Sequence, residues 1–151
     1  MSFPGAIIAG LVATFVFFVL TRLFTMNLMG MERYLSTMFT RREKPSLGLV
    51  LLFVWGIVFS VIYASLWSMG IGWPGYRWGL LFGVVQWLLV GLLVGALPMV
   101  HVGVRRGIVS PPGAYMTKVL GRAAFLAGLL NHAIFGLAVA FFYQFFRTRY
   151  A

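Results

Sequence analysis

The sequence predicts an all-α integral membrane protein: a bundle of four membrane-spanning helices that forms a single domain over residues 1–151. Composition, four long charge-free stretches and the distribution of basic residues predict this fold. Hydrophobic residues make up 62% of the chain and charged residues 9%, whereas a soluble domain carries about 25% charged residues. A bilayer core about 30 Å thick needs roughly 20 apolar residues per spanning helix, and four stretches meet that requirement.

The four predicted spans cover residues 3–21, 47–67, 78–100 and 123–146. The first stretch is interpreted as a retained helix and not as a signal peptide, because no Lys or Arg precedes its apolar run. Between the second and third spans, Gly70, Gly72, Pro74 and Gly75 favour a short turn. We therefore expect these two spans to form a tight antiparallel hairpin.

The connection between the first and second spans predicts an additional helix. Over residues 31–42, Met31, Leu35, Met38 and Phe39 recur at helical spacing among charged and polar residues. This pattern is typical of a short amphipathic helix that lies in the membrane interface.

The basic residues predict the orientation of the chain. The two long connections carry nine of the 12 basic residues, namely Arg22, Arg33, Arg41, Arg42, Lys44, Arg105, Arg106, Lys118 and Arg122. Only Arg77, Arg147 and Arg149 fall on the opposite side. The positive-inside rule then places both termini outside the cytoplasm, and we expect a multi-pass protein of the bacterial cytoplasmic (inner) membrane.

The same basic loops indicate which partners to expect. Near a membrane surface each basic residue contributes about 1 kcal/mol of attraction to anionic lipids, so anionic lipids are the expected partners of the loops, with an acidic protein surface as the alternative. Nucleic-acid binding is not expected despite the net charge of +10. Basic residues of nucleic-acid binders spread over a folded surface, whereas here they are confined to loops.

Small residues recur at every fourth position in each span. The ladders consist of Ala6, Gly10 and Thr14; Gly56, Ser60, Ala64 and Ser68; Gly79, Gly83, Gly91 and Gly95; and Ala124, Gly128, Gly136 and Ala140. Small residues let helix backbones approach closely in lipid, where no hydrophobic force drives association. The ladders predict close helix packing, within the bundle or against other subunits. Trp87 and His132 interrupt the last two ladders.

Polar side chains occur near the middle of every span. At a rise of 1.5 Å per residue, Thr14, Ser60, Gln86, Asn131 and His132 fall at comparable depths. Such groups need hydrogen-bond partners in lipid. We therefore predict a polar belt across the bundle that includes these five residues and involves Trp87, the neighbour of Gln86.

His132 is the one ionisable side chain deep within a predicted span, and intramembrane ionisable residues are functional candidates. One hypothesis is axial ligation of a haem or a chlorophyll-type pigment. The other is a neutral imidazole that hydrogen-bonds Gln86 or Ser60 and holds two helices in register. The only other histidine, His101, lies roughly 12 Å away in depth by helix rise, which excludes a haem ligated by both.

Several chemistries are not expected. The chain has no cysteine, which excludes disulfides and thiolate metal sites. No Asp, Glu, Lys or Arg lies inside a span, although ion-coupled transport normally needs one. No phosphate-binding loop, metalloprotease motif or paired carboxylate is present, so we do not expect an enzyme.

Three segments carry a family resemblance: GAIIAGLVATFVFFVLT at the start, WGIVFSVIYASLW in the second span and HAIFGLAVAFFY in the fourth. They are similar to small four-helix membrane proteins of bacteria with no assigned function. In size and span count the chain also resembles accessory membrane subunits of bacterial electron-transfer complexes, such as quinol-oxidising complexes and photosynthetic reaction centres. That resemblance implies a peripheral role without a cofactor and transfers no binding residue.

Three functions follow as hypotheses. The first is a non-catalytic accessory subunit of a larger membrane complex, respiratory or photosynthetic, whose partners are other membrane subunits. The second is a membrane module that binds a tetrapyrrole through His132, or a quinone or carotenoid in an apolar cleft. The third is a self-assembling small carrier.

Overall fold

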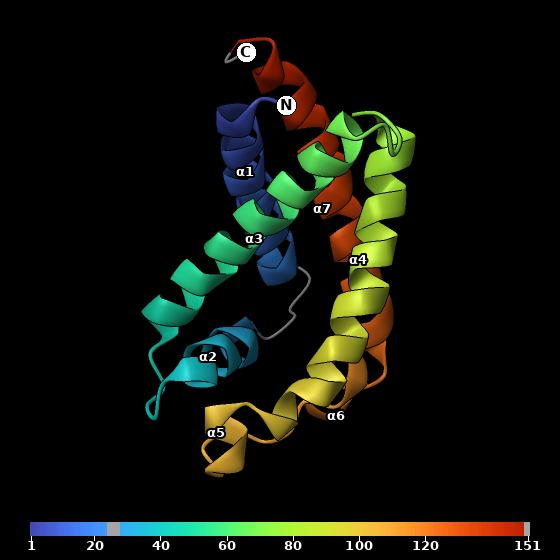
Figure 1. Cartoon of the computed structure of the whole chain (residues 1–151). Helices are drawn as coiled ribbons and strands as arrows, with labels where there is room; N and C mark the ends of the chain where they lie inside the picture. The colour runs from blue at the N-terminus through green and yellow to red at the C-terminus, as the bar shows by residue number, and fades with distance from the viewer. Residues whose placement is uncertain (24–27, 150–151) are drawn as a thin grey trace.

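The computed structural model describes residues 1–23 and 28–149 and confirms the all-α membrane bundle (Figure 1). The helices α1 (Phe3–Leu23), α3 (Pro45–Ser68), α4 (Tyr76–Ala96) and α7 (Ala123–Arg147) are each long and apolar enough to cross a membrane. The chain is thus a multi-pass membrane protein. Helix boundaries agree with the predicted spans to within two residues, except at the end of α4.

Helix α4 ends at Ala96, four residues before the predicted end of the third span. A 3₁₀ turn, η1 (Leu97–Met99), follows and contains Pro98. Proline has no backbone N–H and its ring clashes with the preceding turn of an α-helix, so the apolar run continues while the α-helix does not.

The two ends of the bundle differ in charge. Both chain termini and the 69–75 loop lie at one end, which we call the terminal end (Figure 1). The opposite, basic end carries α2 (Leu28–Phe39), α5 (Val102–Arg105), the 3₁₀ turn η2 (Ala114–Met116) and α6 (Thr117–Leu120). Both basic connections therefore lie on the same side of the membrane, as expected.

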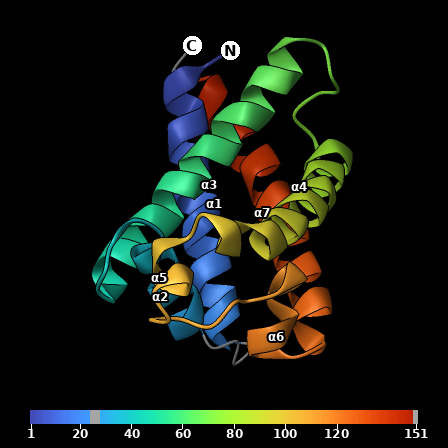
Figure 2. The same ribbon diagram turned by 60° about the horizontal axis from the view of Figure 1, so that its bottom comes forward.

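The predicted amphipathic helix is present as α2, but its apolar side faces the bundle. Tyr34 and Leu35 are buried, while Phe39 is 68% exposed. Helix α2 packs against α3 and α5 (Figure 2), and Gly48 of α3 lies directly against the backbone of Glu32. A side chain at position 48 would prevent this approach, so α2 is docked on the bundle as part of the fold.

The four spanning helices pack side by side in the order α3, α1, α7, α4. Small residues bring α1 and α3 together: Gly10 lies against the backbone of Ile57 and Gly56, and Gly56 lies against the hydroxyl of Thr14. The Ser60 hydroxyl, also on α3, donates a hydrogen bond of 2.7 Å to the Ala6 carbonyl of α1. The first two ladders therefore pack against each other.

The ladders of α4 and α7 interlock in antiparallel register. Gly79 lies against Gly136, and Gly83 lies against the backbone of His132. One turn further, the indole of Trp87 lies on Gly128. The residue that interrupts each ladder thus stands opposite a glycine of the other helix, which leaves room for the large side chain without separating the backbones.

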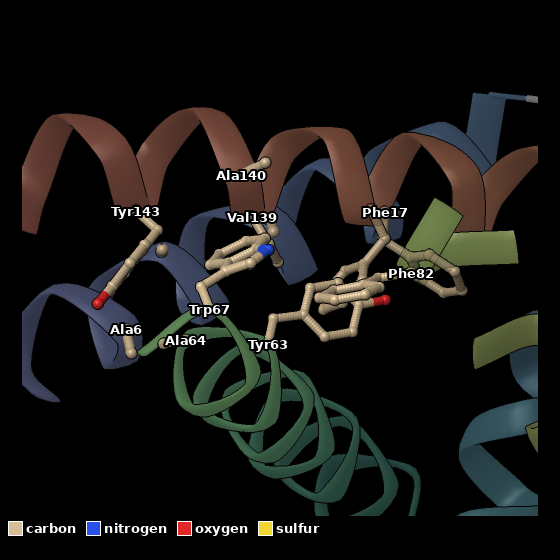
Figure 3. Close-up of a cluster of buried hydrophobic side chains, with 12 residues drawn as sticks. Ala6, Phe17, Tyr63, Ala64, Trp67, Phe82, Val139, Ala140 and Tyr143 are labelled. Atoms are coloured by element: carbon tan, nitrogen blue, oxygen red, sulfur yellow. The ribbon is translucent and has the colours of Figure 1, made fainter. Parts of the chain in front are cut away.

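Aromatic side chains of α3, α4 and α7 meet in the core, beside small residues of α1 such as Ala6 (Figure 3). Trp67 stacks on Phe82 with ring centroids 5.8 Å apart. Tyr63 meets Phe82 edge-on at 5.1 Å, and Trp67 lies 5.5 Å from Tyr143. Such aromatic pairs contribute about 0.5–1.5 kcal/mol each beyond the area they bury, so these rings hold the helices together at the terminal end.

The prediction of a tight hairpin between α3 and α4 is wrong. The two helices leave the 69–75 loop together and then diverge towards the basic end (Figure 1). Their small residues face α1 and α7, so Tyr63, Trp67 and Phe82 occupy the seam between them. Large rings keep the two backbones apart, and the seam widens beyond the last aromatic contact.

We expect Gly83→Val to destabilise the bundle, because the added carbons meet the backbone of His132, which cannot move aside without shifting α7. Overpacking of this kind costs about 1–3 kcal/mol. The unfolding free energy in mixed detergent micelles measures the effect. The matched control is Val85→Phe, which adds volume two residues away at an exposed position; equal stability of the two variants would contradict the α4–α7 packing.

The orientation of the bundle stays a prediction and can be tested with single cysteines, since the natural chain has none. Met69 and Ser110 are both exposed and lie at the terminal and basic ends, respectively. In intact cells we expect a membrane-impermeant maleimide to label Met69→Cys and to label Ser110→Cys only after permeabilisation. The reverse pattern would place both termini in the cytoplasm.

Candidate functional site

A cavity of about 290 Å³, which we call the lateral cavity, lies where α3 and α4 diverge. Its floor comes from α1 and α7 through Phe17 and Phe135, and α2 covers it at the basic end through Tyr34. Its volume is close to the lower limit of about 300 Å³ for small-molecule sites. Most lining side chains are apolar or aromatic, as is typical of such sites.

The mouth of the lateral cavity faces the surface that the lipid would cover. Trp55 of α3 is 42% exposed and Leu93 of α4 is 61% exposed, and both line the cavity. These side chains stand on the two diverging helices, at membrane depth. These two exposed lining residues place the border of the cavity on the surface that lipid would cover.

His132 lines the lateral cavity from α7 and is 9% exposed. Its Nδ1 lies 2.8 Å from the Gly128 carbonyl oxygen. A carbonyl only accepts hydrogen bonds, so Nδ1 carries the proton, and in a neutral imidazole Nε2 is then an unprotonated acceptor. Nε2 has no hydrogen-bond partner within the described part of the chain. The expected bond from His132 to Gln86 or Ser60 is therefore not formed.

Two aromatic rings fix the orientation of this imidazole. Trp87 lies 4.8 Å away, ring centroid to ring centroid, and Phe17 meets it edge-on at 5.3 Å. Together with the bond to Gly128 these contacts leave the ring little freedom to rotate. The Nε2 lone pair is accordingly a preorganised acceptor in an apolar surrounding.

Gln86 supplies a donor to the same cavity. The Tyr63 hydroxyl donates a hydrogen bond of 2.6 Å to Oε1 of Gln86, which fixes the orientation of the amide. Its nitrogen makes no hydrogen bond to another described residue. The lateral cavity thus contains a fixed donor on α4 and a fixed acceptor on α7.

Two further polar groups on cavity-lining residues lack partners. The Trp87 Nε1 and the Tyr34 hydroxyl are buried without a hydrogen bond among the described residues. A buried polar group left unpaired costs about 1–3 kcal/mol, and the cost is not recovered from lipid. Around this cavity, these two groups are therefore further hydrogen-bonding atoms without a partner among the described residues.

The predicted polar belt is not continuous. Thr14 donates to the Gly10 carbonyl in its own helix at 2.7 Å, and Ser60 bonds the backbone of α1. Asn131 is buried beside His132 on α7. The Thr14 and Ser60 hydroxyls each bond a backbone carbonyl, whereas Gln86, Trp87 and His132 of the predicted set line the lateral cavity and each have a polar nitrogen with no partner among the described residues.

His101 belongs to a separate cluster at the basic end. Its ring stacks on Tyr34 with centroids 4.1 Å apart, Nε2 lies 2.9 Å from the Tyr34 carbonyl, and Nδ1 accepts from the Val104 N–H at 3.2 Å. Both nitrogens are used, and the residue ties α5 to α2. Burial raises the pKa of the Tyr34 hydroxyl to about 12, because the ionised form loses its hydration. This cluster is structural.

Sequence reasoning missed the segment that packs on α4 and α7 and contributes Tyr115 and Met116 to the lateral cavity. Tyr115 and Met116 adopt the left-handed conformation, with φ of 55° and 58°, which costs non-glycine residues of the order of 1–3 kcal/mol each. The strained turn directs Tyr115 onto Gly91 and Trp87. Pro111, Pro112 and Gly113 favour a turn at this place in the chain, but their pattern does not indicate that the turn packs against the bundle.

Comparisons of the chain with models of protein families, with curated proteins and with solved structures find no match. The geometry of the lateral cavity therefore carries the functional argument by itself. Among the described residues no three His, Asp or Glu side chains gather in a way that would hold a metal ion. Among the His, Asp and Glu residues that the structure describes, His132 is the one that lines the lateral cavity.

The two histidines should carry their protons on opposite nitrogens. The carbonyl partners require Nδ1–H in His132 and Nε2–H in His101. We expect a ¹⁵N spectrum of histidine-labelled protein at neutral pH to show both tautomers in equal amounts, with His101→Gln assigning the signals. A single tautomer for both residues would contradict the orientation of His132 on which the acceptor depends.

Proposed function

We propose that this chain is a membrane module that binds a lipophilic quinone-class molecule taken from the bilayer. The observation that carries the proposal is the Nε2 of His132, an imidazole acceptor at membrane depth that has no partner among the described residues, on a side chain that lines a cavity of about 290 Å³. A neighbouring unpaired amide nitrogen on Gln86 adds a donor. An apolar cavity with a few convergent polar groups is the usual form of a small-molecule site.

The shape of the lateral cavity suits a ring with a long apolar tail. The aromatic residues Phe17, Phe59 and Trp87 line its interior and offer faces and edges to a flat head group. Its mouth lies between α3 and α4, so an isoprenoid tail would remain in the lipid while the head group occupies the interior. Binding would then require little burial of the tail.

The other ligands that the sequence suggested fit less well. A tetrapyrrole macrocycle is much larger than a one- or two-ring head group, and Trp87 and Phe17 already contact the His132 ring. A carotenoid hydrocarbon has no group that bonds the Nε2 of His132 or the Gln86 amide. A quinone-class head group has ring oxygens for such contacts, and its size suits a cavity near the lower limit for ligand sites.

An accessory role in an electron-transfer complex remains compatible with quinone binding, but no feature of the bundle supports it independently. Ladder residues in all four spans pack within the chain, for example Gly10 on Gly56 and Gly79 on Gly136. Their small side chains therefore do not form a free face for a neighbouring subunit. The hypothesis of a self-assembling carrier also depends on a free small-residue face, so it is not supported by the ladders either.

We expect the purified chain in lipid nanodiscs to bind decylubiquinone saturably, and Leu52→Trp to weaken binding at least about tenfold, equivalent to roughly 1.4 kcal/mol. Leu52 lines the lateral cavity, and an indole at this position would occupy it. Equilibrium binding of radiolabelled decylubiquinone, with empty nanodiscs subtracted, gives the measurement.

The matched control is Val54→Trp, which places the same side chain two residues away at an exposed position of α3. It should bind decylubiquinone like the natural chain. Uptake no greater than that of empty nanodiscs, or equal binding by Leu52→Trp and Val54→Trp, would contradict the proposal.

A further inference from the structure

We infer that the lateral cavity binds the reduced, hydroquinone form of its ligand more tightly than the oxidised quinone, with a hydroquinone O–H donating to Nε2 of His132. This inference rests on the proposed function and specifies the redox state that the site selects. It follows from which polar atoms of the cavity donate and which accept.

His132 lines the cavity and can only accept a hydrogen bond at Nε2. The bond to the Gly128 carbonyl places its proton on Nδ1, so Nε2 of the neutral ring has a lone pair and no hydrogen. Protonating Nε2 as well would create a cation in the bilayer core, which costs several kcal/mol. The partner of Nε2 must therefore be a hydrogen-bond donor.

The two redox forms differ in their ability to supply that donor. The ring oxygens of an oxidised quinone are carbonyls, which accept only, so a quinone oxygen placed at Nε2 would set one lone pair against another. The oxygens of a hydroquinone are hydroxyls, which donate and accept. Only the reduced form satisfies Nε2, and an unsatisfied buried acceptor is costly.

Gln86 does not offset this preference. Its Oε1 is occupied by the Tyr63 hydroxyl, so the amide offers the cavity its nitrogen, a donor. A donor bonds a quinone carbonyl and a hydroquinone oxygen alike. The oxidised form therefore has a partner at one of the two fixed polar groups, and the reduced form has a partner at both.

Anaerobic equilibrium binding of decylubiquinol and decylubiquinone to the chain in nanodiscs tests the inference. We expect the reduced form to bind roughly tenfold more tightly, because a buried acceptor left without its hydrogen bond costs about 1–3 kcal/mol. By linkage, a tenfold preference raises the midpoint potential of the bound two-electron couple by about 30 mV relative to the couple free in the bilayer. A potentiometric titration of the natural chain measures this shift independently of any variant.

Replacement of His132 should remove the preference without requiring loss of binding. His132→Phe retains a ring between Trp87 and Phe17 but offers no acceptor, so the ratio of the two dissociation constants should fall to about one, since the buried acceptor that sets it is gone. If this variant does not fold, His132→Gln serves instead. Its amide both donates and accepts, so it should also reduce the ratio, by improving quinone binding.

The outcomes separate the two proposals. Failure of both decylubiquinol and decylubiquinone to bind the natural chain would overturn the proposed function and this inference with it. Binding of both forms with equal affinity, tighter binding of the quinone, or a preference that survives in His132→Phe would overturn the inference alone.

Discussion

Close backbone contact at small residues is the constraint from which the arrangement of the bundle follows. Gly10 and Gly56 bring α1 against α3, while Gly79, Gly83 and Gly136 bring α4 against α7. In lipid, helix association depends on such close packing because no hydrophobic force drives it. The small residues of α3 face α1 and those of α4 face α7. The large side chains of Tyr63, Trp67 and Phe82 therefore meet between α3 and α4. Helices α3 and α4 are in contact through these rings, and the lateral cavity lies where the two helices diverge beyond them.

The lateral cavity thus results from the way the helices pair. Its polar character depends on which polar side chains near it already have hydrogen-bond partners within the bundle. The hydroxyl of Thr14 donates to the Gly10 carbonyl one turn earlier in α1, and the hydroxyl of Ser60 donates to the Ala6 carbonyl of the neighbouring helix α1. Gln86 accepts from the Tyr63 hydroxyl and His132 bonds the Gly128 carbonyl, while the Gln86 amide nitrogen and Nε2 of His132 have no partner among the described residues. An unpaired polar group is costly in a bilayer, which is why the proposed function rests on these two side chains.

Much of the fold was accessible from the sequence, because apolar length and loop charge dominate membrane architecture. The four spans, the helix in the first connection and the candidate His132 all followed from local patterns. The pairing of helices did not, since the ladders show that each helix has a close-packing face but not which helix it meets. The divergence of α3 and α4 and the strained turn at Tyr115 depend on that pairing. The tautomer of His132 depends on the exact approach of the Gly128 carbonyl, which no sequence pattern indicates.

The side-by-side order α3, α1, α7, α4 has a consequence for biosynthesis. Helix α7 contacts both α1 and α4, yet it leaves the ribosome after the other three spans. Until it is inserted, the glycine face of α4 lacks its α7 partner, and α1 is covered by α3 alone. The bundle is therefore completed only after all four helices are in the membrane, by association of inserted helices. A chain shortened before α7 would lose the floor of the cavity together with the contacts that position α4, and quality-control proteases of the membrane would encounter it as an unassembled set of helices.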